Sequence, residues 1–381
     1  MTLYALYLFA ALNHALKTGT NVTLLLAALS LQASPAVVGA LTAIGGVLPT
    51  LLAVYIGRLN DRFGARLPLF VGSGTVIVSS TIPAMWPGLP ALFVTAILTG
   101  LGATAFAVST QSVVGLFGQT EDRARNFSWL SIAFSCGAII GPMAAGPVID
   151  LAGHTSAFVM LAFLPVPAMI VSGTALLVLP PPREAGRRTS AADGRARPAK
   201  RALDLLRDRQ LRTVYLLTAL HVSAWEVFSF LVPVYGSGIG LAATSIGVIL
   251  GAFATATFFV RIVMPYFAKR YTALGLIRAS LVLAAVLFIF FPLASSVPVL
   301  IALAFLLGMD LGVTQPLAMV VLHESAPSGR TGEAVGLRTS VVNLTATGTP
   351  VVYGALGGAL GMVPVFWGIA AAIGAAVWAL S

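Results

Sequence analysis

The sequence predicts an all-α integral membrane protein with twelve transmembrane helices in two pseudo-symmetric halves of six. Three observations lead to this fold class: a very apolar composition, apolar runs of membrane-spanning length, and basic residues confined to alternate connections. Of 381 residues, 58% are hydrophobic and 9% are charged, against about 25% charged in an ordinary soluble domain. So few polar residues cannot cover the surface of a soluble protein, so lipid is the expected solvent.

Apolar runs follow one another along the chain, separated by short breaks of Gly, Pro and polar residues. Runs of about 20 residues match the ~30 Å hydrocarbon core of a bilayer. The expected helices are 3–29, 36–57, 67–86, 90–116, 127–150, 156–179, 211–235, 243–267, 272–293, 297–322, 333–356 and 360–380. They give an N-terminal half at 1–180, a basic cytoplasmic linker at 181–210 and a C-terminal half at 211–381.

The basic residues predict the orientation. All of them except Lys17 lie in or near the connections that follow even-numbered spans, while the other connections carry none. Because Lys and Arg concentrate in cytoplasmic loops, we expect a multi-pass protein of the cell inner (plasma) membrane of a bacterium, with both termini in the cytoplasm. This topology accounts for the net charge of +10, so no nucleic-acid partner is expected.

The two halves share glycines and prolines at a constant offset in residue number, 208, which we call the repeat spacing. Such residues mark backbone geometry, and their agreement in several helices indicates a repeated fold. Parallel repeats of this kind, with a substrate site at the midplane between them, are a transporter architecture. The matching pairs are Gly39 and Gly247, Arg62 and Arg270, Gly100 and Gly308, Pro142 and Pro350, Gly146 and Gly354, and Gly153 and Gly361.

The connection between the second and third spans reads GRLNDRFGAR, a turn with glycines at its bends and charges between them. It resembles motif A of the major facilitator superfamily, which implies the major facilitator fold. The resemblance implies that the aspartate interacts with the positive N-terminal end of the eleventh helix and holds a cytoplasmic gate shut. The gate residues would be Gly57, Asp61, Arg62, Gly64 and Arg66, together with Arg338 at the start of the eleventh span.

The fifth span contains GAIIGPMAAG, which resembles motif C of the drug and metabolite antiporters in that superfamily. Small residues and a Gly-Pro pair allow close helix approach and a kink. The matching positions, expected to pack helices, are Gly137, Gly141, Pro142 and Gly146. One position departs from this branch, because Ala96 stands where its members usually carry an arginine implicated in proton transfer.

Polar and charged residues inside the spans are expected to face a wet cavity, because charge at mid-membrane is costly. On the first span His14, Lys17 and Asn21 share one helical face. We expect Asp310 or Glu226 to carry a proton, with Asp310 the first choice. The full predicted substrate and proton cavity is His14, Lys17, Asn21, His221, Glu226, Asp310, Gln315 and Asn343.

These features predict a secondary active transporter that moves a small organic molecule by alternating access, as a proton-coupled exporter. Uptake or exchange of an organic anion bound through Lys17 and His14 is the alternative, and a non-transporting receptor on a transporter fold is a remote one. The expected partners are a small-molecule substrate, protons and the lipid bilayer, and the expected state is a monomer. The scattered histidines and the missing phosphate-binding loop predict no enzyme activity, no metal and no cofactor.

Overall fold

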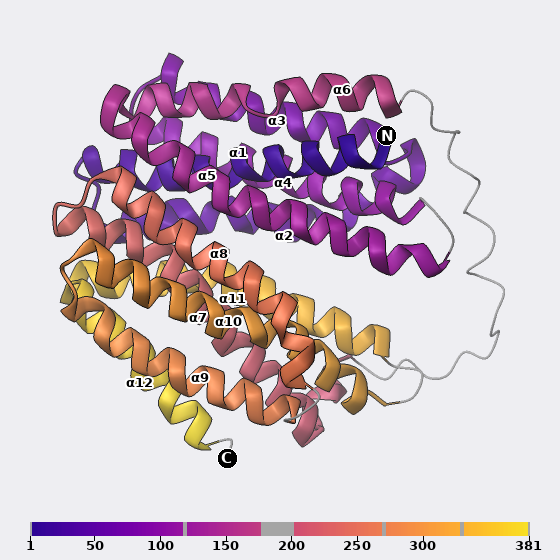
Figure 1. Cartoon of the computed structure of the whole chain (residues 1–381), viewed down its shortest axis with the longest axis vertical. Helices are drawn as coiled ribbons and strands as arrows, with labels where there is room; N and C mark the ends of the chain where they lie inside the picture. The colour runs from indigo at the N-terminus through magenta and orange to yellow at the C-terminus, as the bar shows by residue number, and fades with distance from the viewer. Residues whose placement is uncertain (1, 117–119, 177–201, 269–271, 328–330, 380–381) are drawn as a thin grey trace.

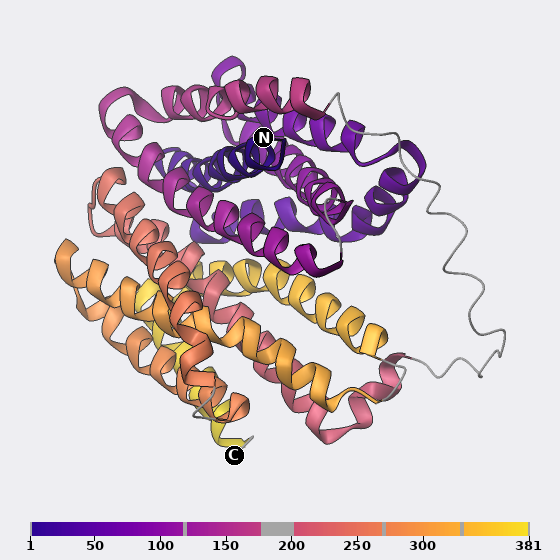
Figure 2. The same ribbon diagram turned by 45° about the vertical axis from the view of Figure 1, so that its right-hand side comes forward.

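The computed structural model describes residues 2–116, 120–176, 202–268, 272–327 and 331–379, which form α-helices, two 3-10 helices and short turns. Figure 1 shows the helices of the two halves running across the view, with the indigo-to-magenta half above the pink-to-yellow half. Figure 2 shows the same division after a turn of 45°. The chain is thus a two-layered bundle of long helices.

The helix bounds follow the predicted spans closely. The first half contains α1 Thr2–Ser30, α2 Pro35–Phe63, α3 Arg66–Met85, α4 Leu89–Leu116, α5 Thr120–Phe163 and α6 Val166–Leu176. The second half contains η2 Ala202–Arg207, α7 Arg209–Gly238, α8 Ala243–Ala268, α9 Ala273–Phe290, η3 Phe291–Leu293, α10 Val297–Ser325, α11 Thr331–Leu360 and α12 Met362–Ala379.

The predicted fifth and sixth spans are divided by a sharp kink within α5, between their expected ranges. Gly153 interrupts the helical backbone there, with φ 81°. The rest of the expected sixth span is interrupted before Pro165 and resumes as α6. The glycine supplies the left-handed backbone that reverses the chain. Gly361, its equivalent at the repeat spacing, does the same between α11 and α12, with φ 84°.

Nine stretches of the described chain are helical, long and apolar enough to cross a membrane. One of them, Arg125–Gly173, has 49 residues and covers both α5 and α6. Helices α1 and α11 are not among the nine, because each carries several polar side chains within its apolar sequence. The polar residues of these two otherwise apolar helices are therefore candidates for a site inside the bundle.

Hydrogen bonds also recur at the repeat spacing. The Tyr7 hydroxyl on α1 donates to the backbone oxygen of Asn126 on α5 at 3.3 Å. The Tyr215 hydroxyl on α7 donates to the backbone oxygen of Ala334 on α11, also at 3.3 Å. Both the donor and the acceptor of the second bond are the repeat equivalents of those in the first. The two halves therefore use the same interhelical contact.

The halves meet along two pairs of helices, α2 with α11 and α5 with α8. At each contact a glycine of one half faces a proline carbonyl of the other, and a Cβ at that glycine would run into the carbonyl oxygen. Gly39 faces Pro350 on α11, and Gly247 faces Pro142 on α5. The two contacts are related by the repeat spacing, so the interface has approximate twofold symmetry.

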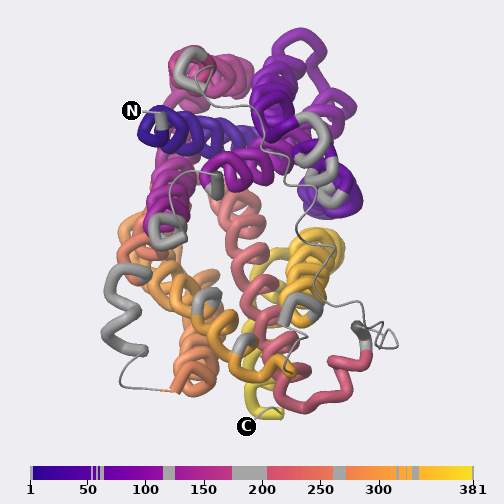
Figure 3. Tube along the Cα trace, turned by 90° about the vertical axis from the view of Figure 1, so that its right-hand side faces the viewer, coloured from indigo at the N-terminus to yellow at the C-terminus, as the bar shows by residue number. Residues whose placement is uncertain are grey.

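We call the end of the bundle where α6 ends and η2 begins the linker side. Figure 3 looks at the molecule from this side and shows the first half above the second. Helices α5 and α11 run away from the linker side, whereas α2 and α8 run towards it. The close contacts at Gly39 and Gly247 therefore lie near the opposite end of the bundle, which we call the far side.

Candidate functional site: a charged cavity between the halves

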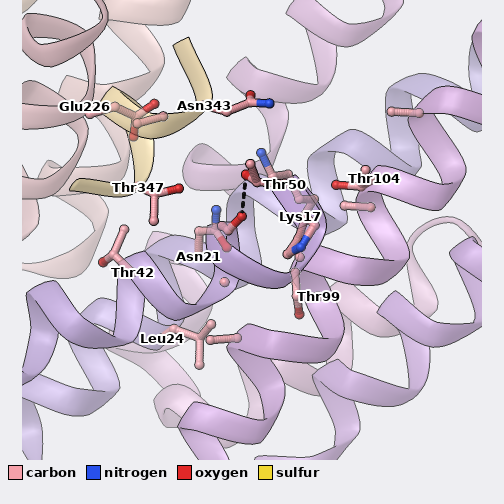
Figure 4. Close-up of a pocket in the computed structure, with 18 of the residues that line it drawn as sticks. Lys17, Asn21, Leu24, Thr42, Thr50, Thr99, Thr104, Glu226, Asn343 and Thr347 are labelled. Atoms are coloured by element: carbon pink, nitrogen blue, oxygen red, sulfur yellow. Dashed lines mark hydrogen bonds between the residues drawn. The ribbon is translucent and has the colours of Figure 1, made fainter. Parts of the chain in front are cut away.

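A cavity of about 400 Å³ lies between the two halves. Helices α1, α2 and α4 line it from the first half, and α7 and α11 line it from the second. Figure 4 shows its polar side chains converging from both halves. A site of this kind changes shape whenever the halves move relative to each other.

Helix α1 presents three polar side chains to the cavity. His14, Lys17 and Asn21 all line it, as their spacing along one helical face requires. Lys17 is half-buried. An ammonium inside a membrane protein is costly unless it meets water, an acid or a ligand, so the cavity is the place where Lys17 can meet such a partner.

The rotation of α1 is fixed on both sides of that face. On one side the Asn13 side-chain nitrogen donates to the Ser73 hydroxyl on α3 at 2.6 Å. On the other, the Thr18 hydroxyl lies 3.2 Å from the Gly137 carbonyl oxygen on α5, a hydrogen bond that it shares with the His14 carbonyl oxygen of its own helix at 3.0 Å. These bonds hold α1 between its neighbours, so Lys17 cannot turn away from the cavity without breaking them.

The second half contributes an acid and neutral polar groups. Glu226 on α7, with Asn343 and Thr347 on α11, lines the cavity and lies across from Lys17 in Figure 4. An acid and a base from opposite halves thus share one cavity.

Aromatic packing positions the part of α7 that carries Glu226. The neighbouring Trp225 ring meets the Phe253 ring on α8 edge-to-face, with centroids 4.7 Å apart. The Phe228 ring stacks on the same Phe253 ring at 4.3 Å. Aromatic contacts of this kind stabilise the packing beyond the burial of the rings themselves. They hold α7 in the position in which Glu226 lines the cavity between the halves.

Helices α2 and α4 form a wall of small and hydroxyl side chains, none of which the sequence analysis placed in the cavity. On α4 the lining residues are Ala96, Thr99, Gly100, Ala103, Thr104, Ala107 and Val108, a repeat of three and four residues that places them on one helical face. On α2, Thr42 and Thr50 line the cavity beside glycines. The periodic small residues of α4 were the signal available in the sequence.

Two of the predicted cavity residues, His221 and Asp310, are not brought to it. His221 is buried on α7, with its ring 6.3 Å from the Trp225 ring, and is not among the lining residues. Asp310 is buried on α10, where its backbone oxygen accepts a 3.0 Å hydrogen bond from the Ser280 hydroxyl of α9. The side chain of Gln315 lies outside the described residues. Glu226, and not Asp310, is the acid that faces Lys17.

Only part of the predicted cytoplasmic gate lies within the described residues. Gly64 follows the last residue of α2 with φ 76°, a left-handed conformation that suits glycine. Arg66 begins α3, and Arg338 is buried on α11. The side chains of Asp61 and Arg62, the environment of Gly57 and the side chains of residues 331–333 at the start of α11 lie outside the described residues. The role predicted for Asp61 stays a prediction.

The residues that resemble motif C lie at close helix contacts. Gly137 and Gly141 lie against α1, where a Cβ would meet backbone atoms, and Pro142 and Gly146 lie against α8. At Gly146 an added Cβ would lie 2.6 Å from the carbonyl oxygen of Ala243. Small side chains here therefore let α5 approach both α1 in its own half and the first turn of α8 in the other half.

The comparison with protein families identifies the fold. The model of the Major Facilitator Superfamily matches residues 4–350. The chain belongs to the Major Facilitator Superfamily. Members of this superfamily are membrane transporters, so the prediction of an all-α major facilitator fold and of a multi-pass transporter is confirmed.

Curated relatives of this superfamily member are transport proteins. The class C tetracycline resistance protein of Escherichia coli is 34% identical over 113 residues, which cover 28% of this chain and 27% of that protein. The class D protein of Salmonella ordonez is 24% identical over 325 residues, or 83% of this chain and 78% of that protein. The human chromaffin granule amine transporter is 25% identical over 145 residues, covering 38% of this chain and 28% of that one. The chain spans 27–30% of the length of the class C, class B and class G tetracycline resistance proteins.

Solved structures share the fold at low sequence identity. A peptide transporter POT superposes with a TM-score of 0.82 at 16% identity, over 99% of this chain and 93% of that one. The nucleoside transporter NupG superposes with a TM-score of 0.79 at 13% identity, over 100% of this chain and 99% of that one.

Proposed function

We propose that this superfamily member exports a small organic molecule in exchange for protons, by alternating access of its two halves around the cavity. The observation that carries the proposal is the pair of opposite charges, Lys17 on α1 and Glu226 on α7, in one cavity between the halves. A transporter must change its affinity as it changes shape, and a charge pair across the moving interface can supply that change.

Glu226 would be the proton carrier. When the cavity is empty, an ionised Glu226 and Lys17 attract each other across it. A proton on Glu226 removes this attraction, and so does a substrate that engages either charge. Proton and substrate therefore compete for the ionised carboxylate of Glu226. Competition of this kind couples the inward movement of a proton to the outward movement of substrate. The sequence analysis made Asp310 the first choice for this role. Asp310 is buried on α10 and does not line the cavity, so we assign the role to Glu226.

The relatives support export. Tetracycline resistance proteins and amine transporters are similar to this chain, and the residues resembling motif C belong to the antiporter pattern. Ala96, at the position of the missing arginine, lies in the small-residue wall of the cavity. Without a long side chain there, the wall leaves room for an apolar or amphipathic substrate beside Lys17 and Glu226.

The basic residues support the orientation. They follow the even-numbered spans, so the linker side would be cytoplasmic and both termini would lie inside. In this orientation the protein works in the inner membrane of a bacterial cell as a monomer, with the lipid bilayer, protons and a small molecule as its partners.

Uptake or exchange of an organic anion is the second candidate function. His14 and Lys17 line the cavity on the same face of α1, and a carboxylate could bind the lysine with help from the imidazole. In this function Lys17 binds substrate directly, and the direction of transport is inward.

Two steps test the proposal. A thermal-shift screen of the purified protein against tetracyclines, monoamines and organic acids identifies a ligand, since one that binds only the folded state raises the melting temperature. That radiolabelled ligand is then offered to inside-out and right-side-out vesicles under a proton gradient. Export predicts accumulation in inside-out vesicles, lost in Glu226→Gln. Accumulation in right-side-out vesicles, lost in Lys17→Ala, would overturn export and establish anion uptake.

A further inference from the structure

The first turn of α8 is held by a side chain from the other half of the protein. Asp150 lies on α5 near its kink, at the far side of the bundle. One carboxylate oxygen accepts from the backbone N–H of Ala243 at 2.9 Å. The other accepts from the backbone N–H of Thr244 at 2.8 Å and from its hydroxyl at 2.5 Å. Three hydrogen bonds thus join the two halves at one point.

These bonds satisfy groups that α8 cannot satisfy by itself. The first N–H groups of a helix have no intrahelical partner and usually receive a side-chain cap from the preceding residue. Ala242 precedes α8 and has no side-chain acceptor. Ser34 is its repeat equivalent before α2, and the Ser34 hydroxyl oxygen accepts from the Val37 N–H. One of two equivalent helices caps itself, and the other takes its cap from the opposite half.

The carboxylate has no counterpart at the other interface. Gly358 is the repeat equivalent of Asp150, and a Cβ added to it would lie 3.8 Å from the backbone nitrogen of Ala36. Ala36 in turn corresponds to Thr244. The backbones at both interfaces therefore meet in the same way, but only the α5–α8 interface carries a cap that crosses between the halves.

We propose that Asp150 is a gate residue that holds the far side of the transporter closed. Opening that side requires α8 to separate from α5. The first turn of α8 then loses its hydrogen-bond acceptors, and the Asp150 carboxylate loses its donors. Because the cap is built from the opposite half, its formation depends on closure. A cap within α8 would stabilise the helix equally in the open and closed states and would not affect the gate.

The test measures the distance across the far side with paired spin labels. Cysteines replace Trp86 at the end of α3 and Ser295 before α10, both exposed, in a Cys136→Ser background. Loss of an aspartate cap costs about 1 kcal/mol, which corresponds to about a fivefold rise in the open-to-closed ratio. Asp150→Ala is expected to increase the long-distance population by this factor, and Asp150→Asn, which retains one acceptor, by less.

A second substitution separates gating from helix stability. Asp150→Ala with Ala242→Asp returns a cap to α8 from its own half. We expect the melting temperature to recover while the long-distance population stays raised. Return of both quantities to wild-type values would overturn the proposal, because Asp150 would then act as a helix cap only. An unchanged distance distribution in both Asp150→Ala and Asp150→Asn would overturn it as well.

Discussion

Replacing Gly146 by alanine should force the far side of the transporter open. The added methyl carbon would lie 2.6 Å from the carbonyl oxygen of Ala243 and 2.7 Å from the Cα of Thr244. Both are backbone atoms, so no side chain can rotate to make room. Ordinary contact begins at 3.4 Å, so α5 and α8 must separate locally by about 0.8 Å.

Overpacking of this kind costs about 1–3 kcal/mol. The strain exists only while α5 and α8 are in contact, so it falls on the closed state alone. A cost of about 2 kcal/mol would raise the ratio of open to closed far sides about 30-fold. The same separation would also pull the first turn of α8 away from Asp150, so the two effects act in the same direction.

The label pair at positions 86 and 295 measures the outcome, and Gly74→Ala is the matched control. Gly74 is a helical glycine on α3 at which an added Cβ meets no heavy atom within 4 Å. That substitution should raise helix stability by about 0.5–1 kcal/mol and leave the distances unchanged. A wild-type distance distribution in Gly146→Ala, with wild-type transport, would refute the view that this contact limits opening.

Three further predictions concern charges and hydrogen bonds. Lys17→Ala should lower the initial transport rate about tenfold more than the double substitution of Lys17→Ala with Glu226→Gln. The single substitution leaves an unpaired carboxylate in the cavity, so equal rates would contradict the pairing. Asp310→Asn should retain pH-driven accumulation of substrate in proteoliposomes. Loss of that accumulation would instead identify Asp310 as the proton carrier. Tyr7→Phe and Tyr215→Phe each remove one interhelical hydrogen bond and should each lower stability by about 1 kcal/mol, with similar falls in melting temperature.

The fold could be predicted from the sequence because a membrane imposes strong constraints. The length of each apolar run and the side on which basic residues fall depend only on the bilayer. The repeat spacing predicted which backbone positions are equivalent, and the contacts at Gly39 and Gly247 follow it. The break of the sixth span before Pro165 was missed, because a proline within an apolar run either kinks or ends a helix.

The site could be predicted only in part, since helix rotation is set by packing and not by hydropathy. Lys17 and its neighbours share a face in any α-helix, so their grouping needed no tertiary information. Asp310 lies on a helix that is apolar all round, and sequence gives no preferred inward face for such a helix. Its rotation is set by contacts such as that of Gly308 with the backbone of Phe253 on α8. The hydroxyls of Thr99 and Thr104 were missed although the small residues of α4 repeat every three and four positions on one helical face.

Symmetry of backbone and asymmetry of charge together explain how one chain can make a transporter. The contacts that recur at the repeat spacing let each half adopt the same helix arrangement and let the halves rock about similar interfaces. The charges do not repeat. Trp225 is the repeat equivalent of Lys17, and Thr18 is the repeat equivalent of Glu226.

The gate follows the same rule. Gly358 stands where a second Asp150 would be, and Ala242 stands where a second Ser34 would be. A scaffold that was symmetric in charge as well would give the two interfaces similar electrostatics and would favour neither closed state. One acid–base pair in the cavity and one carboxylate at a single interface would make the two access states of the proposed mechanism chemically different, as proton-driven exchange between them requires.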